Sequence, residues 1–297
     1  MFTLAQKGGV QFSMLTSSRL ALLVAYDGTP YRGWTDVRDS VLRPTLQRVL
    51  RSADDELPLI ESASRTDAGV HAFGQVCSLS LASRKAELDT GQLRYSLNQL
   101  LPPEVVVRGC KVMDADFDVR ANVAKSYIYK FSTAACRDPL SRLREWHVPP
   151  RRGRPAWNEA AAAAFAEQLR GTHSFAAYGN TPRGKERLTT IDPVCSLSEV
   201  SLARVRYDHE PDDSDAPSGC DSARWCVTVR GDRFLYKMVR NLVGALVRVG
   251  SGELTADECL EALERGSFRR SASVPLTAPA HGLTLQRVEY ALDPFPN

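Results

Sequence analysis

Short apolar runs and two amphipathic segments alternate over roughly the first hundred residues. The run Leu20–Tyr26 is almost wholly apolar and stops at the turn-forming residues 27–30, which predicts a buried strand. The segment Pro44–Ala53 carries apolar side chains on one face at helical spacing and predicts a helix. The same criteria predict, in chain order, strands at Leu57–Ile60 and Gln75–Leu81, a helix at Asp89–Leu100 and a strand that begins at Val105.

A comparable series of elements follows in the rest of the chain. Alternating polar and apolar residues predict a strand at Lys125–Phe131. The alanine-rich segment Asn158–Leu169 predicts a helix, with Gly171 as its stop signal. The later elements expected are strands at Val194–Val205 and Trp225–Arg230, helices at Tyr236–Val249 and Ala256–Arg265, and a final strand at Leu283–Tyr290.

This order of elements predicts two α/β halves, each a sheet with helices on one face. The change from one series to the next falls near residues 112–122. We therefore expect a flexible N-terminal segment at 1–18, an N-terminal half at 19–115 and a C-terminal half at 116–297.

A loop of nine mostly small or polar residues, Ser64–Ala72, separates two of the predicted strands. It contains a guanidinium at Arg65, a carboxylate at Asp67 and an imidazole at His71. The sequence Asp-Ala-Gly is typical of a turn, because Asp can bond its own backbone and Gly tolerates positive φ. Taken alone, the loop is better explained as a strand connection with a weak surface ion pair.

Two further polar side chains interrupt apolar elements. Tyr127 lies on a predicted strand, and in isolation a core or edge aromatic is the better explanation. Arg240 lies at the margin of the apolar stripe of the helix Tyr236–Val249. An arginine there is costly unless its head reaches solvent or a carboxylate pairs with it. Lys237 lies one helical turn before it on the predicted helix.

The composition is that of an ordinary globular protein, with 43% hydrophobic and 25% charged residues. No apolar run approaches the roughly 20 residues that span a bilayer. The seven cysteines are odd in number, and neither C-x-x-C nor H-x₃₋₅-H spacing occurs, which argues against a disulfide framework and a structural zinc site. We expect no metal and no cofactor. A cytoplasmic location is the default expectation; an organellar one, mitochondrion or plastid, stays open because residues 1–18 are polar and lack acidic side chains.

The distribution of charge is more informative than the net charge of +3, which comes from 38 basic and 35 acidic residues. Acidic residues gather in the segment 208–215. Basic residues cluster away from it, and this separation modestly favours binding to a polyanion. The three basic clusters consist of Arg142, Arg144, Arg151, Arg152 and Arg154, then Arg183, Lys185 and Arg187, and finally Arg265, Arg269 and Arg270.

Four motifs occur in a fixed order along the chain: YDGTPYRGW from Tyr26, SRTDAGVHA from Ser64, FLYKMVRNLVGALVRVG from Phe234 and TAPAHGLTLQRVEY from Thr277. With them the chain resembles the tRNA pseudouridine synthase A family, collinearly from about Leu20 to Tyr290. Smaller matches fall in order between these motifs: Thr45-Leu46-Gln47, Asn98-x-x-Leu101-Pro102, Phe117-x-x-Arg120, Tyr127-x-Tyr129 and Gly171-Thr172-His173-Ser174-Phe175.

The resemblance implies an α+β pseudouridine synthase fold. This fold has two ferredoxin-like or RRM-like halves, a mixed and mostly antiparallel sheet, helices on one face and a basic cleft between the halves. It also implies an isomerase that converts uridine to pseudouridine in tRNA without a cofactor, with positions 38–40 of the anticodon stem-loop as targets. Family members are commonly homodimers, so tRNA and a second copy are the expected partners, and a membrane is not.

The resemblance assigns the catalytic aspartate to Asp67, as nucleophile or as base at the sugar–base step. Arg240 matches the arginine that pairs with this carboxylate and favours its ionised form. Tyr127 matches the aromatic that stacks on the target base, which must leave its helix stack to be reached. Arg65 matches the loop arginine that fills space beside the flipped nucleotide. Further contacts with the substrate are expected from Leu283, which closes the pocket, and from Lys237, Arg32 and His71.

The chain departs from the family pattern at several positions. Ser64 replaces the usual Gly at the start of the loop, and Lys237 replaces a frequent His. Thr35 follows Trp34 where Gln is usual, Asp118 replaces a His, Val37–Arg43 carries a short insertion, and the segment 208–222 is longer than usual. None of these changes removes a group that the reaction needs, so they bear on tRNA position and fine specificity.

Three other functions stay open. The chain could be an RRM-like RNA-binding protein without catalytic activity, since two such halves can bind RNA without reacting. It could be a synthase of the same family that acts on other tRNA positions or other RNAs. An aspartate-dependent hydrolase would need a second acid or a metal near Asp67, and the sequence offers neither in an obvious place.

Overall fold

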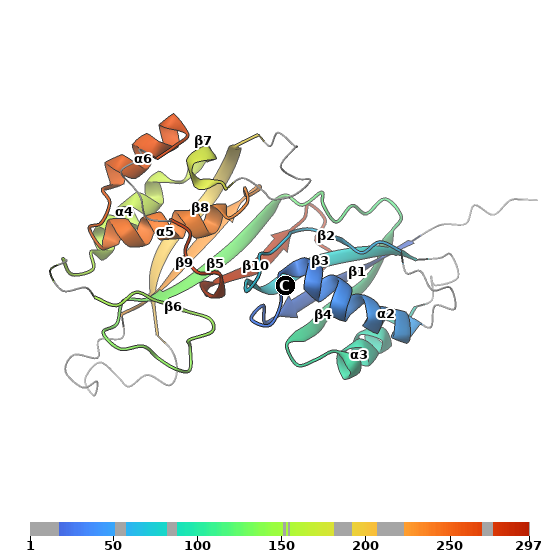
Figure 1. Ribbon diagram of the computed structural model, residues 1–297. Helices are drawn as coiled ribbons and strands as arrows, with labels where there is room; N and C mark the ends of the chain where they lie inside the picture. The colour runs from blue at the N-terminus through green and yellow to red at the C-terminus, as the bar shows by residue number, and fades with distance from the viewer. Residues whose placement is uncertain are drawn as a thin grey trace, which may run out of the picture.

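The computed structural model describes residues 18–50, 58–81, 88–150, 153, 155–180, 192–206, 223–268 and 276–296. The fold is α+β, as predicted, and is built on one ten-stranded sheet (Figure 1). The strands are β1 (Ser18–Tyr26), β2 (Glu61–Ser62), β3 (His71–Leu81), β4 (Val105–Asp114), β5 (Ala124–Ser132), β6 (Trp146–His147), β7 (Gly171–Ser174), β8 (Val194–Val205), β9 (Arg224–Gly231) and β10 (Leu283–Glu289). The α-helices are α1 (Trp34–Asp36), α2 (Arg43–Leu50), α3 (Thr90–Leu100), α4 (Glu159–Gln168), α5 (Met238–Gly250) and α6 (Ala256–Arg265).

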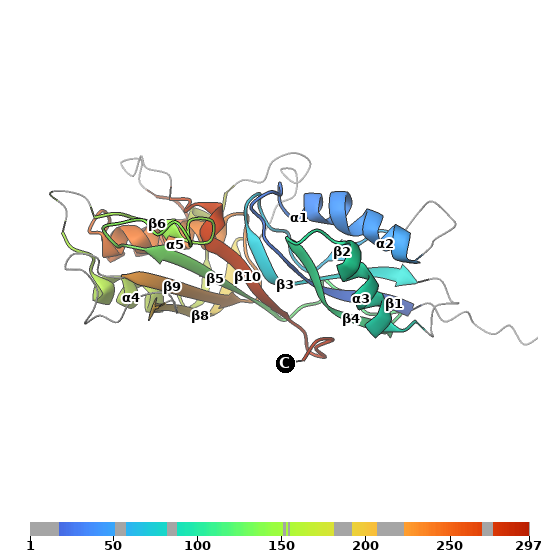
Figure 2. The ribbon, with the colours of Figure 1, turned by 90° about the horizontal axis from the view of Figure 1, so that it is seen from below.

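The last strand of the chain lies in the middle of the sheet. The strand order is β4-β1-β3-β10-β5-β9-β8-β7, with β2 paired to β3 and β6 paired to β5. β10 runs antiparallel to β5 and parallel to β3, which it meets at Thr284↔His71 and Leu285↔Ala72. Both views show β10 between the strands of the first half and those of the second (Figures 1 and 2). The predicted mixed, mostly antiparallel sheet is thereby confirmed.

Helices cover each half of the sheet and bury a continuous apolar core. α2 and α3 lie over the strands of the N-terminal half, and α4, α5 and α6 over those of the C-terminal half (Figure 1). α5 is buried along most of its length, because its predicted apolar stripe is widened by small residues such as Gly244 and Ala245. Within the described ranges, no helix combines the length and apolar character that crossing a bilayer requires.

Several predicted boundaries differ from the observed ones. The prediction of a strand at Leu57–Ile60 was wrong: Pro58, Leu59 and Ile60 form no strand, and the short β2 starts at Glu61, while Leu57 lies outside the described residues. Pro58 has no amide hydrogen to donate to a ladder, and Leu59 is exposed. β3 begins at His71, four residues before the expected start, so the last two residues of the predicted loop, His71 and Ala72, belong to the strand.

The helix α5 begins two residues later than expected, at Met238. Lys237 adopts the left-handed region with φ of 60° and acts as N-cap, so it cannot continue a right-handed helix toward Tyr236. Lys237 therefore precedes the helix and does not lie on its face. It is the one non-glycine residue with positive φ in the described part of the chain.

The insertion expected at Val37–Arg43 forms a π-helix, Val37–Leu42, between α1 and α2. A π-helix closes its hydrogen bonds over five residues and so holds an extra residue per turn. The segment therefore forms a wider turn within a continuous helix, and Val37 and Leu42 stay buried in the core.

Some predicted features lie outside the described residues. These are the N-terminal segment 1–18 apart from Ser18, which begins β1, and the acidic segment 208–222. The same holds for most of the basic clusters, of which only Arg142, Arg144 and Arg265 are described, all three exposed.

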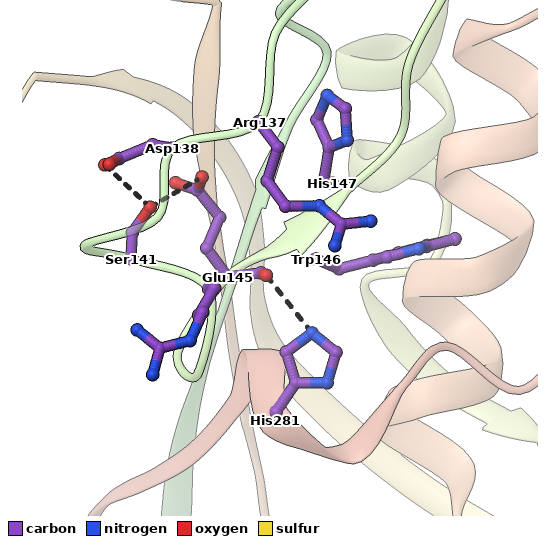
Figure 3. A pocket seen from close by; sticks show the side chains of 8 residues that line it. Arg137, Asp138, Ser141, Glu145, Trp146, His147 and His281 are labelled. Atoms are coloured by element: carbon purple, nitrogen blue, oxygen red, sulfur yellow. Dashed lines mark hydrogen bonds between the residues drawn. The ribbon is translucent and has the colours of Figure 1, made fainter.

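A buried ionic network fixes the segment 133–148 against β9. Figure 3 shows its members Asp138, Ser141 and Glu145, with Ser141 bonded to both carboxylates. The Arg224 guanidinium donates hydrogen bonds to both oxygens of Glu145 at 2.7 and 2.8 Å and to Asp138 Oδ2 at 2.8 Å. Ser141 accepts a further hydrogen bond from Arg224 at 3.0 Å. His281 Nε2 lies 3.1 Å from the Glu145 carbonyl oxygen, which ties the segment to the turn before β10. The two carboxylates that line the polar pocket of about 260 Å³ at this place, Asp138 and Glu145, are therefore both paired with Arg224.

We expect Glu145→Ala to lower the free energy of unfolding by about 3 kcal/mol, because it leaves the buried Arg224 with less compensating charge. Urea unfolding followed by circular dichroism measures the change. Glu167→Ala is the matched control, since Glu167 forms an exposed pair with Arg170, and its removal should cost less than about 0.5 kcal/mol. Equal losses in the two variants would contradict a structural role for the network.

Candidate active site

A cavity of about 930 Å³ lies where the loop after β2 faces the segment before α5 and the start of β5. Its lining combines residues from both parts of the chain, including Leu283 at the start of β10. Seven basic side chains line it, against two acidic ones, Asp67 and Asp232: Arg32, Arg65, Arg120, Lys125, Arg233, Lys237 and Arg240. The structure thus has the basic cleft between the halves that was expected.

A partly buried ion pair lies inside this cavity. The Arg240 guanidinium donates from Nη1 to Asp67 Oδ2 at 2.9 Å, with side-chain exposures of 13% and 23%. Among the described residues, none donates a hydrogen bond to the other carboxylate oxygen, Oδ1. The carboxylate is therefore held at one oxygen, while the second has lone pairs available in the cavity.

Arg240 is itself fixed by the segment that precedes β10. Its Nε donates to the Ala278 carbonyl oxygen at 2.7 Å, and its own carbonyl oxygen accepts from the Ala278 amide at 3.1 Å. This contact requires the segment to run directly along α5. Gly244 permits it, since a Cβ there would lie 1.5 Å from the Leu276 carbonyl oxygen.

The backbone of the Asp67 loop is held by the first loop of the chain, residues 27–34. The Tyr26 hydroxyl lies 2.6 Å from Thr66 Oγ1, and the Trp34 amide donates to the Thr66 carbonyl oxygen at 3.2 Å. Gly33, with φ of 97°, makes the close approach possible, because a Cβ there would lie 2.5 Å from the same carbonyl oxygen. The motif that begins at Tyr26 thus acts as a brace for Asp67.

The turn that carries Asp67 closes on itself. The Val70 amide donates to the Asp67 carbonyl oxygen at 3.1 Å, and Gly69 has φ of 77°, as the Asp-Ala-Gly sequence predicts. The Gly69 amide donates to the Tyr31 carbonyl oxygen at 3.2 Å, which links the turn to the brace.

Tyr127 lies on β5 and forms one wall of the cavity. Its ring is 7% exposed and meets the Phe234 ring edge-on at a centroid distance of 5.1 Å. Its hydroxyl lies 2.9 Å from Ser64 Oγ, so the residue that replaces the usual loop Gly contacts this aromatic. Burial raises the pKa of Tyr127 to about 12, and its phenol is therefore protonated at neutral pH.

The other expected site residues divide into two groups. Arg65, Lys237, Arg32 and Leu283 line the cavity with Asp67, Arg240 and Tyr127. His71 does not line it: the imidazole is 4% exposed, and Nδ1 accepts a hydrogen bond from the Gly28 amide at 3.0 Å. Its Nε2 lies 3.0 and 3.1 Å from the carbonyl oxygens of Leu143 and His281. This geometry makes His71 a support behind the loop.

Sequence reasoning missed some residues of the cavity. Lys125 lies two positions before Tyr127 on the same face of β5, and strand alternation alone would have placed it there. Phe234 and Asp232 gave no such signal, because they belong to an irregular segment. In the described part of the chain, His, Cys, Asp and Glu side chains form no group of three that could hold a metal ion.

Comparison with known proteins agrees with this geometry. Residues 165–291 match a family model described as tRNA pseudouridine synthase. The tRNA pseudouridine synthase A of Chlamydia pneumoniae is 34% identical over 286 residues, which cover 94% of each chain. The enzyme of the same name from Chlamydia trachomatis serovar L2b is 32% identical over 92% of each chain. That of Acetivibrio thermocellus is 30% identical over 91% of this chain and 98% of its own.

These similarities extend over almost the whole chain and include both halves that form the cavity. The chain belongs to the tRNA pseudouridine synthase A family.

Proposed function

We propose that this tRNA pseudouridine synthase isomerises uridine at positions 38–40 of the anticodon stem-loop, with Asp67 as its catalytic carboxylate. The observation that supports this most directly is the Asp67–Arg240 pair of 2.9 Å inside a basic cavity. The target positions rest on the family resemblance.

The reaction rearranges atoms within one nucleotide. The bond between N1 of uracil and C1′ of ribose breaks, and a bond between C5 and C1′ forms. The proton on C5 leaves and N1 gains one, so no atom of another substrate enters the product. A single ionised carboxylate can start this sequence, either as a nucleophile at C1′ or as a base at the sugar. Asp67 Oδ1, which no described donor engages, is the oxygen suited to both roles.

Arg240 holds the Asp67 side chain in one orientation through its contact with Oδ2. Its positive charge lies against Oδ2, and in a partly buried site this attraction is stronger than in water. Because Nε is engaged by the Ala278 carbonyl oxygen, the guanidinium cannot swing toward an RNA phosphate. A lysine could not make both contacts with a fixed planar group.

The other cavity residues would bind the flipped nucleotide. Tyr127 offers a ring for the uracil to stack on, and Leu283 closes the cavity on its β10 side. Arg65 would occupy space left in the RNA, while Lys237 and Arg32 would contact its backbone. His71 would act indirectly, because it supports the turn at Gly28.

A catalytically silent RNA-binding protein fits the cavity less well. A pure binding surface for a polyanion gains nothing from a carboxylate among its arginines, since Asp67 repels phosphate. The hydrogen bonds that Tyr26 and Trp34 make with Thr66 also favour a carboxylate that must be held in place. A cytoplasmic location, where tRNA is modified, is supported by the bacterial origin of the relatives described above.

The target positions can be tested with unmodified tRNA transcripts that carry uridine at 38, 39 or 40, or at none of them. After incubation with the protein, pseudouridine should appear at those three positions, as detected by position-resolved chemical sequencing. The transcript without uridine there should stay unmodified. Modification elsewhere would assign a different specificity, and RNA binding without any pseudouridine would favour the silent protein.

Asp67→Asn should reduce pseudouridine formation by about 10⁴-fold or more, because the amide is neither a nucleophile nor a base. The affinity for tRNA should change little, since the side chain keeps its size. Single-turnover rates and a filter-binding assay measure the two effects. Asp116→Asn is the control, an exposed aspartate that does not line the cavity. An Asp67→Asn variant that still isomerises uridine would show that another group performs the step.

The proposal includes two features of organisation: a functional division into halves 19–115 and 116–297, and a homodimer. The division agrees with the gap between β4, which ends at Asp114, and β5, which begins at Ala124. Light scattering at micromolar concentration should give twice the 32.7 kDa mass of one chain. A value equal to one chain would refute the dimer and leave the proposed chemistry unaffected.

A further inference from the structure

Lys125 extends the wall of the cavity that Tyr127 begins. Side chains alternate along β5, so Lys125 and Tyr127 lie on the same face, about 6.6 Å apart along the strand. Both line the cavity, as do Arg65 and Thr66 of the Asp67 loop. A base stacked on Tyr127 would therefore have the Lys125 ammonium beside its sugar–phosphate portion.

The Lys125 ammonium has no counter-ion within the described structure. No described residue forms a hydrogen bond or ion pair with its Nζ. The nearby charge that acts on Lys125 is the Asp232 carboxylate, whose attraction opposes the lowering of the Lys125 pKa. The Oδ1 of Asp232 is already engaged, because it accepts from the amides of Ser196 at 2.9 Å and Arg233 at 2.7 Å. Lys125 is partly buried, and this burial lowers its pKa.

Three of the arginines that line the cavity differ in this respect. Arg120 pairs with Glu61 at 3.0 Å, Arg233 with Asp192 at 3.1 Å and Arg240 with Asp67 at 2.9 Å. A cation that is removed from water without a partner destabilises the free protein. The binding of a ligand of opposite charge would offset this destabilisation.

We propose that Lys125 is a phosphate-binding residue that holds the RNA phosphate next to the uridine stacked on Tyr127. This inference rests on the proposed function, because it takes RNA as the occupant of the cavity. A compact ammonium suits a single phosphate, and each nucleotide supplies one phosphate close to its base. Lys125 would thus set the depth at which the flipped nucleotide enters, while Asp67 carries out the chemistry.

The test compares Lys125→Met with Lys125→Arg, and with Lys111→Met as matched control. Lys111 is an exposed lysine of β4 that does not line the cavity. Filter binding of a tRNA transcript from about 0.05 to 0.3 M salt gives the affinity and its salt dependence. We expect Lys125→Met to bind roughly 3- to 10-fold more weakly, and its slope of log affinity against log salt to be shallower by about 0.7–0.9. Lys125→Arg and Lys111→Met should behave as wild type.

Two further readouts separate a phosphate contact from other roles. Thermal unfolding of Lys125→Met should be unchanged or shifted upward, because an unpaired buried charge has been removed; a structural role would lower the melting temperature. The single-turnover rate at saturating enzyme should stay within about 3-fold of wild type, whereas a proton-transfer role would reduce it by roughly 100-fold or more and Lys125→Arg would not restore it.

The proposal is overturned if Lys125→Met keeps the wild-type affinity and salt slope, melts at a lower temperature, or loses the single-turnover rate. Failure of the proposed function is recognised independently, because the wild-type protein would then form no pseudouridine in any transcript. The salt slopes would still show whether Lys125 contacts RNA phosphate.

Discussion

The ion pair between Asp67 and Arg240 sets the constraint that the rest of the structure satisfies. The two residues are 173 positions apart: Asp67 lies in the loop between β2 and β3, and Arg240 lies on α5. Each charge would be costly in a partly buried cavity without the other. The sheet order, the direct contact of α5 with the segment before β10 and the position of the Asp67 loop all serve to bring these two side chains within 2.9 Å.

Rigidity around the pair comes from small polar contacts. Ser64 bonds to Tyr127 on β5, and Thr66 bonds to Tyr26 on β1. Arg65 follows the first of these anchors and Asp67 the second, and both line the cavity. A loop anchored at every second residue can hold a carboxylate in one orientation without burying it completely. The proposed role of Asp67 as the single catalytic side chain would depend on such positioning.

The bounds of a helix or strand are predicted well from the sequence where interactions between neighbouring residues determine them. Helix α6 has its predicted bounds, since the capping box of Thr255 and Glu258 starts it and Gly266 ends it. The central place of β10 could not be predicted from its own residues, because strand pairing is a long-range choice. The left-handed backbone conformation of Lys237 could not be predicted either, since nothing in the sequence Tyr-Lys-Met indicates positive φ. The link from Asp67 to Arg240 required the family resemblance, whereas Lys125 follows from alternation along β5.

The central position of β10 has a consequence for how the molecule is made. Ribosomes synthesise a chain from its N-terminus, so β3 and β5 emerge long before the strand that joins them. The strands β4, β1 and β3 can pair early, but Asp67 and Arg240 cannot be locked together until residues 283–289 have left the ribosome. The two groups of strands therefore cannot be joined into one sheet before β10 has been synthesised, and loss of residues 283–289 would remove the junction itself.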